Sequence, residues 1–461
     1  MCPPLSEQRV LSTLNADGKR NWLRPKLARG RFLRRRRIVG YALIALFVAL
    51  PFLEIGGRPA LLLDLVTREL SLFGMVFRPS DGVLLMLLGL SIVVTVFLVT
   101  ALFGRVWCGW GCPQTVYLEH VYRPIERLFE GTPTQQARLP RFHPRRLLKW
   151  VTYAALSFVI ANVFLAYFVG VARPETWVIG SPLDHVGGFL VVLGTAALML
   201  FDFAYFREQT CIVACPYGRL QSVMLDQQSL IVGYDPRRGE PRGQLKKKLP
   251  VLEGKRGDCV DCGACVAVCP TGIDIRDGLQ MECIGCAQCI DACDVVMDKL
   301  EKPRGLIGYT SKAVLAGETR RLMRPRTLIY PALLVVAVGL LAWSVGDKAE
   351  TEVTVERIEG PSFIELPDGT ISAATRIKLE NESDEPRHYR IAVKEPLGLP
   401  IRTPTRWDVA PRKSLGITLY IDVPRDLFVG GKRDVYLEIF ETGGFHRMVT
   451  VTLLGPVGGA K

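Results

Sequence analysis

The sequence predicts a polytopic α-helical membrane protein of about five spans, with an inserted cysteine-rich domain and a C-terminal all-β sandwich. Three observations predict this architecture: long apolar segments, a dense group of cysteines in mid-chain, and short alternating strands near the end. The 461 residues are 49% hydrophobic, and their mean hydropathy is +0.22. A chain of this length and apolarity is not an ordinary soluble enzyme.

Five apolar segments are long enough, or nearly so, to cross the ~30 Å hydrocarbon core of a bilayer. They cover residues 38–55, 82–104, 147–170, 186–206 and 327–346. The first segment follows the run Arg34-Arg35-Arg36-Arg37, so the positive-inside rule predicts a cytoplasmic N-terminus. No small-residue cleavage site follows this segment, and we therefore expect a membrane span here rather than a signal peptide.

Alternation of the five spans predicts a multi-pass protein of a bacterial inner membrane, with the loops 105–146 and 207–326 in the cytoplasm. The loop charges agree, because 105–146 holds seven arginines whereas 171–185 holds only Arg173. The predicted parts are a basic N-terminus (1–37), a four-span membrane domain of two hairpins (38–206), a cytoplasmic loop (207–326), a fifth span (327–346) and an exported domain (347–461). Net charge is +13, but no groove-reading motif accompanies it, so we expect no nucleic-acid partner.

Two segments outside the predicted spans have patterns of their own. Residues 60–77 are apolar but are interrupted by Asp64, Arg68 and Glu69, which predicts an interfacial helix outside the membrane. The exported domain contains short runs such as 417–421 and 449–453, separated by turn signals such as Gly430-Gly431. That spacing predicts an immunoglobulin-like β-sandwich, although the Cys-Trp-Cys hallmark is missing.

Eight of the thirteen cysteines are crowded between residues 259 and 293, which favours metal ligation over a disulfide scaffold. Both halves of this region have the spacing Cys-x2-Cys-x2-Cys-x3-Cys of a bacterial-type two-cluster ferredoxin domain, with a core at about 250–305. The fourth cysteine of each run completes the other cluster in such domains. We therefore assign Cys259, Cys262, Cys265 and Cys293 to cluster one, and Cys269, Cys283, Cys286 and Cys289 to cluster two, both of the 4Fe-4S type.

Two details of this cysteine region stay open. Structural zinc is the alternative ligand, although it leaves the doubled spacing unexplained. Asp294 stands where ferredoxins have a proline, and we expect this change to loosen one turn without removing a ligand.

A second set of cysteines lies at the predicted cytoplasmic edge of the membrane. Cys108 and Cys112 follow the first hairpin, Cys211 and Cys215 follow the second, and each pair ends in Cys-x-x-x-Cys-Pro. On a helix, positions i and i+4 share a face, so four sulfurs could converge and bind a soft cation such as Cu(I). Two alternatives remain: small residues in tight helix packing, or a thiol-disulfide relay. Met224, His120 and His143 are nearby, and we expect them to be packing or surface residues.

Several further motifs accompany the cysteines and carry a resemblance to a known family. They are Trp107-Cys108-Gly109, Cys112-Pro113-Gln114-Thr115-Val116-Tyr117-Leu118-Glu119, Arg123-Pro124-Ile125-Glu126-Arg127, Cys215-Pro216-Tyr217-Gly218-Arg219-Leu220-Gln221-Ser222, Arg238-Gly239-Glu240-Pro241-Arg242-Gly243, Cys289-Ile290-Asp291-Ala292-Cys293-Asp294 and Pro303-Arg304-Gly305-Leu306-Ile307. The chain resembles, over essentially its whole length, the FixG/RdxA/CcoG family of cytochrome c oxidase accessory proteins.

The resemblance implies an oxidoreductase that reduces Cu(II) to Cu(I) and supplies copper to a cbb3-type cytochrome c oxidase. The expected copper site is Cys108, Cys112, Cys211 and Cys215. The expected partners are the lipid bilayer, copper ions, an unidentified electron donor, and a copper chaperone, a copper-exporting ATPase or oxidase assembly factors. The alternatives are a membrane electron conduit of the NapH or NosR type and a non-enzymatic, redox-sensing assembly scaffold. No Cys-x-x-Cys-His motif is present for a c-type haem.

Overall fold

The computed structural model describes most of the chain. The described residues are 13, 19–65, 67–79, 81–140, 142–181, 183–243, 257–321, 323–346, 351–356, 358, 360–381, 383, 385–396, 398–411, 413–441 and 444–456. The chain divides into two compact units, residues 1–342 and 343–461, and each is described by itself. Most of the predicted basic N-terminus before Lys19, and residues 250–256 of the predicted ferredoxin core, lie outside the described residues.

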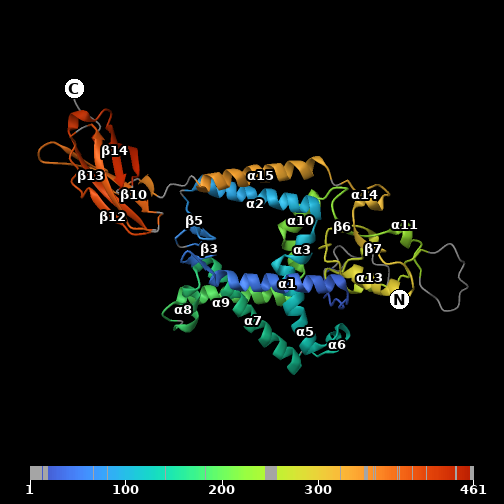
Figure 1. The fold of residues 1–461 in the computed structure, drawn as a ribbon. Coiled ribbons are helices and arrows are strands. Elements are labelled where there is room, and N and C mark those ends of the chain that lie inside the picture. The colour runs from blue at the N-terminus through green and yellow to red at the C-terminus, as the bar shows by residue number, and fades with distance from the viewer. Residues whose placement is uncertain are drawn as a thin grey trace, which may run out of the picture. The chain divides into compact units, whose positions relative to one another are not determined.

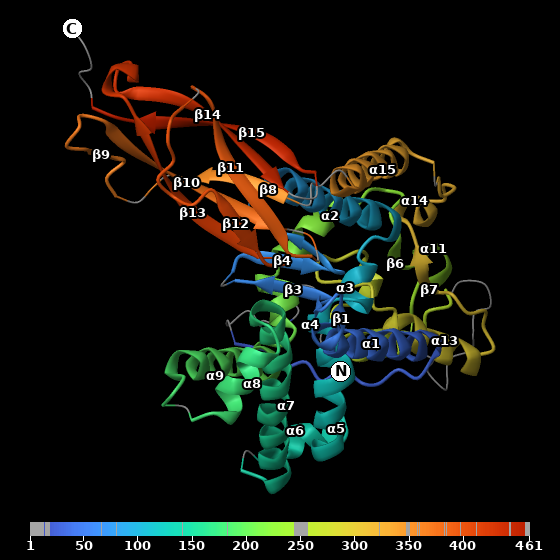
Figure 2. The same ribbon diagram turned by 60° about the vertical axis from the view of Figure 1, so that its left-hand side comes forward.

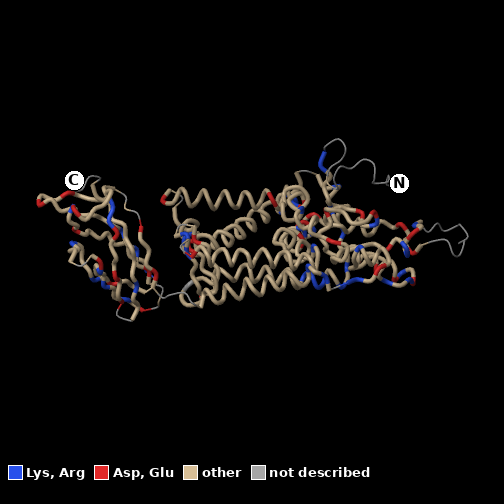
Figure 3. Tube along the Cα trace, turned by 90° about the horizontal axis from the view of Figure 1, so that it is seen from above, with Lys and Arg blue, Asp and Glu red and all other residues tan. Residues whose placement is uncertain are grey.

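Four helices in the described part of the chain are long and apolar enough to cross a membrane: Gly82–Phe103, Pro144–Val169, Val186–Phe206 and Pro325–Gly346. They are α2 (Gly82–Phe103), α7 (Pro144–Val169), α9 (Val186–Leu200) with its π-helical continuation η3 (Phe201–Phe206), and α15 (Pro325–Gly346). Helices α2 and α15 lie side by side, and α7 packs on α9 (Figure 1). Charged residues gather at the ends of these helices and are scarce along their middles (Figure 3).

The first predicted span corresponds to α1 (Arg31–Ala49), which continues into η1 (Leu50–Phe52). Its first seven residues contain five arginines, so α1 does not meet the composition expected of a span, and five spans remain a prediction. Helix α1 contacts α7 through stacked rings, with the centroids of Phe47 and Tyr167 5.2 Å apart. The Tyr167 hydroxyl also donates to the Phe47 carbonyl oxygen at 2.6 Å.

The prediction of an interfacial helix over residues 60–77 is wrong, because this segment forms strands. A two-stranded sheet consists of β1 (Glu54–Ile55) and β2 (Arg58–Pro59), and a three-stranded sheet has the order β3 (Leu61–Asp64), β4 (Glu69–Leu72), β5 (Met75–Phe77). Phe73 and Gly74, with φ of 49° and 87°, make the tight turn between β4 and β5. Positive φ at both central residues is the turn geometry that suits a two-residue β-hairpin.

Short helices connect the long ones and begin at prolines in several places. After α2 come α3 (Val106–Trp110), α4 (Pro113–Tyr117), η2 (Leu118–Tyr122), α5 (Arg123–Glu130) and α6 (Pro133–Arg138). Helix α8 (Ala172–Ile179) joins α7 to α9, and η4 (Thr210–Ala214) and α10 (Pro216–Met224) follow η3. Proline is favoured at the first helical position because its missing N–H would have no partner there.

The cysteine-rich domain lies at the end of the helices opposite β3–β5 (Figures 1 and 2). Its elements are β6 (Ile231–Tyr234), α11 (Pro236–Gly239), α12 (Ala264–Ala267), η5 (Ile275–Asp277), α13 (Gln288–Lys299), β7 (Ile307–Thr310) and α14 (Lys312–Leu315), with β6 antiparallel to β7. Asp294 does not loosen a turn, because it lies within α13 and accepts the Gly305 N–H at 3.1 Å. A residue that has its own N–H lets the helix continue past Cys293, which a proline would oppose.

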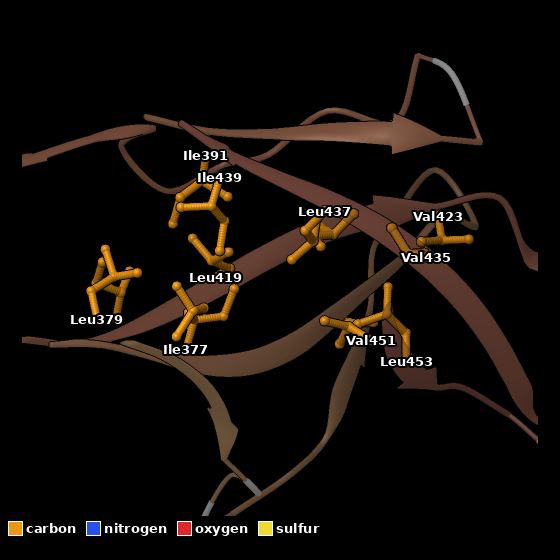
Figure 4. Packing of buried hydrophobic residues seen from close by; sticks show 14 of the residues in the cluster. Ile377, Leu379, Ile391, Leu419, Val423, Val435, Leu437, Ile439, Val451 and Leu453 are labelled. Carbon is orange, nitrogen blue, oxygen red and sulfur yellow. The ribbon is translucent and has the colours of Figure 1, made fainter. Parts of the chain in front are cut away.

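The second unit is a β-sandwich of two antiparallel four-stranded sheets, counted over its described residues. One sheet contains β8 (Thr351–Glu356), β9 (Phe363–Glu365), β10 (Ile371–Asn381) and β13 (Ser414–Val423). The other has the order β12 (Arg406–Val409), β11 (Arg387–Glu395), β14 (Lys432–Glu441), β15 (His446–Leu454), and η6 (Arg425–Leu427) precedes β14. Alternate residues such as Ile377, Leu419 and Leu437 point into one apolar core (Figure 4).

Truncation of this core should destabilise the sandwich. Leu437→Ala removes a fully buried side chain, and we expect the local free energy of unfolding to fall by about 2–5 kcal/mol. Hydrogen exchange at the amides of β14 and β15 measures the change. The matched control is Tyr436→Ala, since Tyr436 points outward and is 41% exposed. Equal exchange in the two variants would contradict the core assignment.

Candidate metal centres

Five of the ferredoxin-type cysteines line one cavity, and a cluster is the group that fits it. The cavity has about 350 Å³ of empty space, which includes space open to solvent, and is otherwise lined by apolar side chains and Thr271. Its cysteines are Cys265, Cys269, Cys283, Cys286 and Cys289. Sulfur ligands in an apolar pocket suit an iron-sulfur cluster, whose potential depends on burial and nearby charge.

Cys293 and Cys289, one helical turn apart in α13, have different electrostatic neighbours. Burial raises the pKa of Cys293, and Cys265, Cys262, Asp294 and Cys259 also raise it, so that together they bring the pKa to about 12. Burial also raises the pKa of Cys289 well above its ordinary value, and Cys286, Cys283, Cys269 and Cys265 contribute in decreasing order. The cysteine neighbours of Cys293 thus all come from the first run of four cysteines, whereas those of Cys289 come from both runs.

The two Cys-x-x-x-Cys-Pro motifs fold alike, although not as continuous helices. Span α2 ends at Gly104 (φ 59°, ψ −130°), and the η3 end of the fourth span is Arg207 (φ 55°, ψ −121°), in each case four residues before the first cysteine. The second cysteine, Cys112 or Cys215, is extended and caps a new helix that begins at proline. The prediction that each pair shares one face of a continuous helix is therefore wrong. The helix that holds the first cysteine of each pair ends before the second cysteine.

The four thiols of these motifs nevertheless lie close enough to influence one another. Burial raises the pKa of Cys211, and Cys112, Cys108 and Cys215 also raise it, so that the pKa reaches about 12. Burial raises the pKa of Cys108 to about 11, where the nearby Arg105 opposes the rise and Cys112 and Cys215 increase it. The two hairpins thus bring their cysteines to one place at the end of the bundle.

This place lies directly against the cysteine-rich domain. Cys108, Ile284 and Cys286 form one buried apolar cluster, with Tyr217 packed against it. Gly109 is required here, because a Cβ at that position would lie 2.6 Å from the Ile284 carbonyl oxygen and 2.8 Å from the Cys286 nitrogen. The loop that carries Cys283 and Cys286 is therefore in backbone contact with the first membrane-edge motif.

Buried polar side chains that the sequence did not suggest hold the thiols in place. Gln221 is fully buried, accepts from the Cys108 sulfur at 3.0 Å and donates to Thr100 and Tyr217. Asp202, inside the third apolar helix (Val186–Phe206), accepts from Gln114 at 3.2 Å and from Thr210 at 2.5 Å. Gln114 and Thr210 adjoin Cys112-Pro113 and Cys211, so one carboxylate joins the two motifs. Its position within an apolar span was the signal that could have identified it.

An ionic network ties the helices to the cysteine-rich domain. Arg123 is buried, pairs with Glu119 and Glu208, and donates to the Pro270 carbonyl oxygen at 3.3 Å. Gln288, at the start of α13, donates to Glu119 at 3.2 Å. Removing one member of a buried ionic network leaves an uncompensated charge, so the docking of the two parts is strongly specified.

The other candidate side chains near the thiols have separate contacts. His120 is buried in η2 against Gly40, and burial lowers its pKa to about 4, with Arg36 and Arg37 contributing. His143 caps α7 by accepting the Arg145 N–H at 3.2 Å. Throughout the described part of the chain, no three His, Cys, Asp or Glu side chains are grouped to hold a metal ion.

Comparisons with known proteins agree with this description. A family model described as a 4Fe-4S dicluster domain matches residues 206–312, a 4Fe-4S binding domain matches 85–131, and the Ig-like fold at the C-terminus of FixG matches 341–456. The chain is similar to protein RdxA of Cereibacter sphaeroides, with 35% identity over 84% of this chain and 85% of the relative. It is also similar to the nitrogen fixation protein FixG of Rhizobium meliloti, with 33% identity over 84% and 81%.

A solved structure, that of a FixG-related protein from Vibrio parahaemolyticus, covers 23% of this chain and 98% of its own, with 13% identity and a TM-score of 0.21. The helices, the cysteine-rich domain and the family models define an iron-sulfur electron-transfer protein with membrane-spanning helices. The chain belongs to the FixG/RdxA family.

The substitution Gly109→Ala should disrupt the contact between the first membrane-edge motif and the Cys283–Cys286 loop. The added methyl group meets backbone atoms that cannot rotate away, so we expect the Cys283–Cys286 loop to shift, faster hydrogen exchange over residues 281–287, and less bound iron. The control is Gly89→Ala, because a Cβ at Gly89 in α2 meets nothing within 4 Å. Wild-type exchange and iron content in Gly109→Ala would show that the contact is dispensable.

Proposed function

We propose that this protein reduces Cu(II) to Cu(I) at Cys108, Cys112, Cys211 and Cys215, with electrons delivered through two 4Fe-4S clusters. Cluster one is held by Cys259, Cys262, Cys265 and Cys293, and cluster two by Cys269, Cys283, Cys286 and Cys289. The cysteines that act on Cys293 are Cys265, Cys262 and Cys259, and those that act most on Cys289 are Cys286, Cys283 and Cys269, ahead of Cys265, which supports this division. The clusters supply single-electron transfer, which is the step that Cu(II) requires.

The contact of Cys108 with Ile284 and Cys286 carries the proposal. Cys262 of cluster one is exposed, whereas Cys286 of cluster two is buried against the membrane-edge thiols. An electron that enters near Cys262 therefore reaches Cys108 by way of the cluster-two ligands. The four thiols are the end of that route, because every other described cysteine is one of the eight proposed cluster ligands.

Thiolate ligands favour Cu(I) over Cu(II), and a site built from them assists the reduction. The four side chains influence one another without being grouped around a single ion, so copper binding requires them to close on the metal. Hydrogen bonds limit how far the two motifs can move. Gln221 accepts from Cys108, and Asp202 accepts from Gln114 and Thr210, which lie close to Cys112 and Cys211 in the sequence.

The likeness to FixG and RdxA supports a place for this activity in copper supply to a cbb3-type cytochrome c oxidase. We place the protein in a bacterial inner membrane with the clusters cytoplasmic and the β-sandwich periplasmic, because the arginine-rich loops lie at the cluster end of the helices. The Cu(I) would pass to a copper chaperone, a copper-exporting ATPase or oxidase assembly factors. The electron donor is a cytoplasmic partner.

A membrane electron conduit of the NapH or NosR type is the second candidate, because the same contact could pass electrons onward to a periplasmic partner. Copper distinguishes the two candidates. A conduit needs no copper at the thiols, whereas a cupric reductase reoxidises its clusters when Cu(II) is added. A redox-sensing scaffold would show neither reaction.

Anaerobic mixing of the reduced protein with Cu(II) tests the reductase. We expect the cluster absorbance to recover as one Cu(I) forms per electron, and a chelator specific for Cu(I) measures the product. The double variant Cys108→Ser, Cys211→Ser should slow this reaction by about tenfold or more and keep its cluster iron, since it removes only copper ligands. Cys2→Ser is the control for loss of a thiol. Clusters that stay reduced in the wild-type protein would exclude copper reduction.

Copper affinity should rise with pH. Cys108 and Cys211, with pKa values near 11 and 12, are protonated at neutral pH, so Cu(I) must displace their protons. We expect the affinity to rise about tenfold per pH unit for each proton released between about pH 6 and about pH 8. Competition with a Cu(I) chelator measures it. Cys108→Ser should give a shallower slope, and an affinity that does not change with pH would argue against thiolate ligands.

A further inference from the structure

Arg36 has a buried positive charge whose partners do not compensate it. It belongs to the arginine run at the start of α1, but it is 1% exposed, whereas Arg34, Arg35 and Arg37 are exposed. Its Nε donates to the Gly109 carbonyl oxygen at 2.9 Å. Its two terminal nitrogens, Nη1 and Nη2, are buried and have no hydrogen-bond partner among the described residues. A buried, unpaired guanidinium is costly and requires an explanation.

The position of Arg36 supplies the explanation. Gly109, which accepts its hydrogen bond, is in backbone contact with Cys286. Phe32, one turn earlier, packs against the hydrophobic core of the cysteine-rich domain, against which Cys283 and Cys289 also pack. Burial raises the pKa of Cys286, and the Arg36 charge is the largest influence that opposes the rise. The unpaired guanidinium therefore lies within electrostatic reach of the cluster-two ligands.

Arg105 approaches the same ligands from the end of α2. It is 8% exposed, donates to the Met281 carbonyl oxygen, and has a buried Nε without a partner among the described residues. Its charge opposes the rise in the pKa of both Cys108 and Cys283. Arg105 thus lies between the membrane-edge thiols and cluster two, on a different element from Arg36.

The surroundings of cluster one are different. The cation that acts on Cys265 is Arg276, and it is neutralised by Asp274 at 2.6 Å and by Asp261 at 2.5 Å. Asp294 lies beside Cys293, and the exposed Arg31 is 3.7 Å from its carboxylate. Among the residues that the structure describes, buried positive charge without a carboxylate partner is therefore found at the cluster-two ligands and not at the cluster-one ligands.

We propose that Arg36 and Arg105 are the buried counter-charges of cluster two and raise its reduction potential. Reduction adds a negative charge to a cluster, and burial alone would oppose it, whereas nearby cations stabilise the reduced form. The two arginines therefore make cluster two the better electron acceptor and direct electrons from the exposed cluster one toward Cys108. This inference rests on the cluster assignment of the proposed function, but it does not depend on copper.

Redox titration of the anaerobically purified full chain, followed by EPR and without copper, tests the inference. We expect Arg36→Met to shift one of the two midpoint potentials to a more negative value and to leave the other unchanged. Arg36→Lys should restore most of the shift, because it keeps the charge. Arg105→Met should move the same midpoint in the same direction. The matched control is Arg37→Met, which removes an exposed arginine next in sequence and should move neither midpoint.

The remaining outcomes decide against the inference. Unchanged midpoints in Arg36→Met and Arg105→Met, with normal iron and sulfide content, would overturn it, as would equal shifts of both midpoints. If Arg36→Met lowers the iron content and Arg36→Lys keeps the wild-type iron content, the positive charge is required and the inference is supported. If Arg36→Lys also loses iron, Arg36 has a packing role and the inference is overturned. Copper reduction is measured separately, so failure of the proposed function leaves these potentials to be judged alone.

Discussion

The close backbone contact between Gly109 and Cys286 is the constraint on which the rest of this structure depends. No side chain fits between the two segments, so the first membrane-edge motif and a cluster-ligand loop must dock as rigid surfaces. Trp110 and Tyr309 hold the loop from one side, because the Trp110 indole donates to the Tyr309 hydroxyl at 3.0 Å, which donates to the Gly285 carbonyl oxygen at 2.9 Å. In the proposed route, electron delivery to the thiols requires this docking.

The sequence predicted what local spacing determines. The apolar lengths predicted the four helices, and the alternation near the C-terminus predicted the sandwich. It did not predict the strands of residues 61–77, because their apolar run is short and the deciding turn at Phe73-Gly74 is not a common hairpin pair. It also did not separate Arg36 from Arg35 and Arg37. Only the tertiary packing shows which arginine of a charged run faces inward.

Conformational strain accompanies the second motif. Arg207 has a positive φ where the equivalent residue of the first motif is Gly104, and a non-glycine residue in that region costs about 1–3 kcal/mol. The side chain is held by Glu126 at 3.1 and 3.2 Å, and these ion pairs raise the pKa of Arg207 despite its burial. The same network continues through Glu208 to Arg123 and the Pro270 carbonyl oxygen. The strained residue beside Cys211 is therefore fixed by the contacts that dock the cysteine-rich domain.

The duplication of the motif and its asymmetric docking together suggest how the site works. Two similar helix ends provide four thiols at one place, which a single hairpin could not supply. The first motif makes backbone contact with the ligand loop, through Gly109, and its Cys108 is buried against that loop, whereas the second motif reaches the same cluster only through Tyr217 at its edge. Cys211 has Thr115, just after the first motif, as its hydrogen-bond neighbour. In the proposed route, electrons therefore enter through the first motif, and the second motif completes the ligand set. In that route, a similar pair of helix ends becomes a directional site because the cysteine-rich domain makes its close backbone contact with one of them.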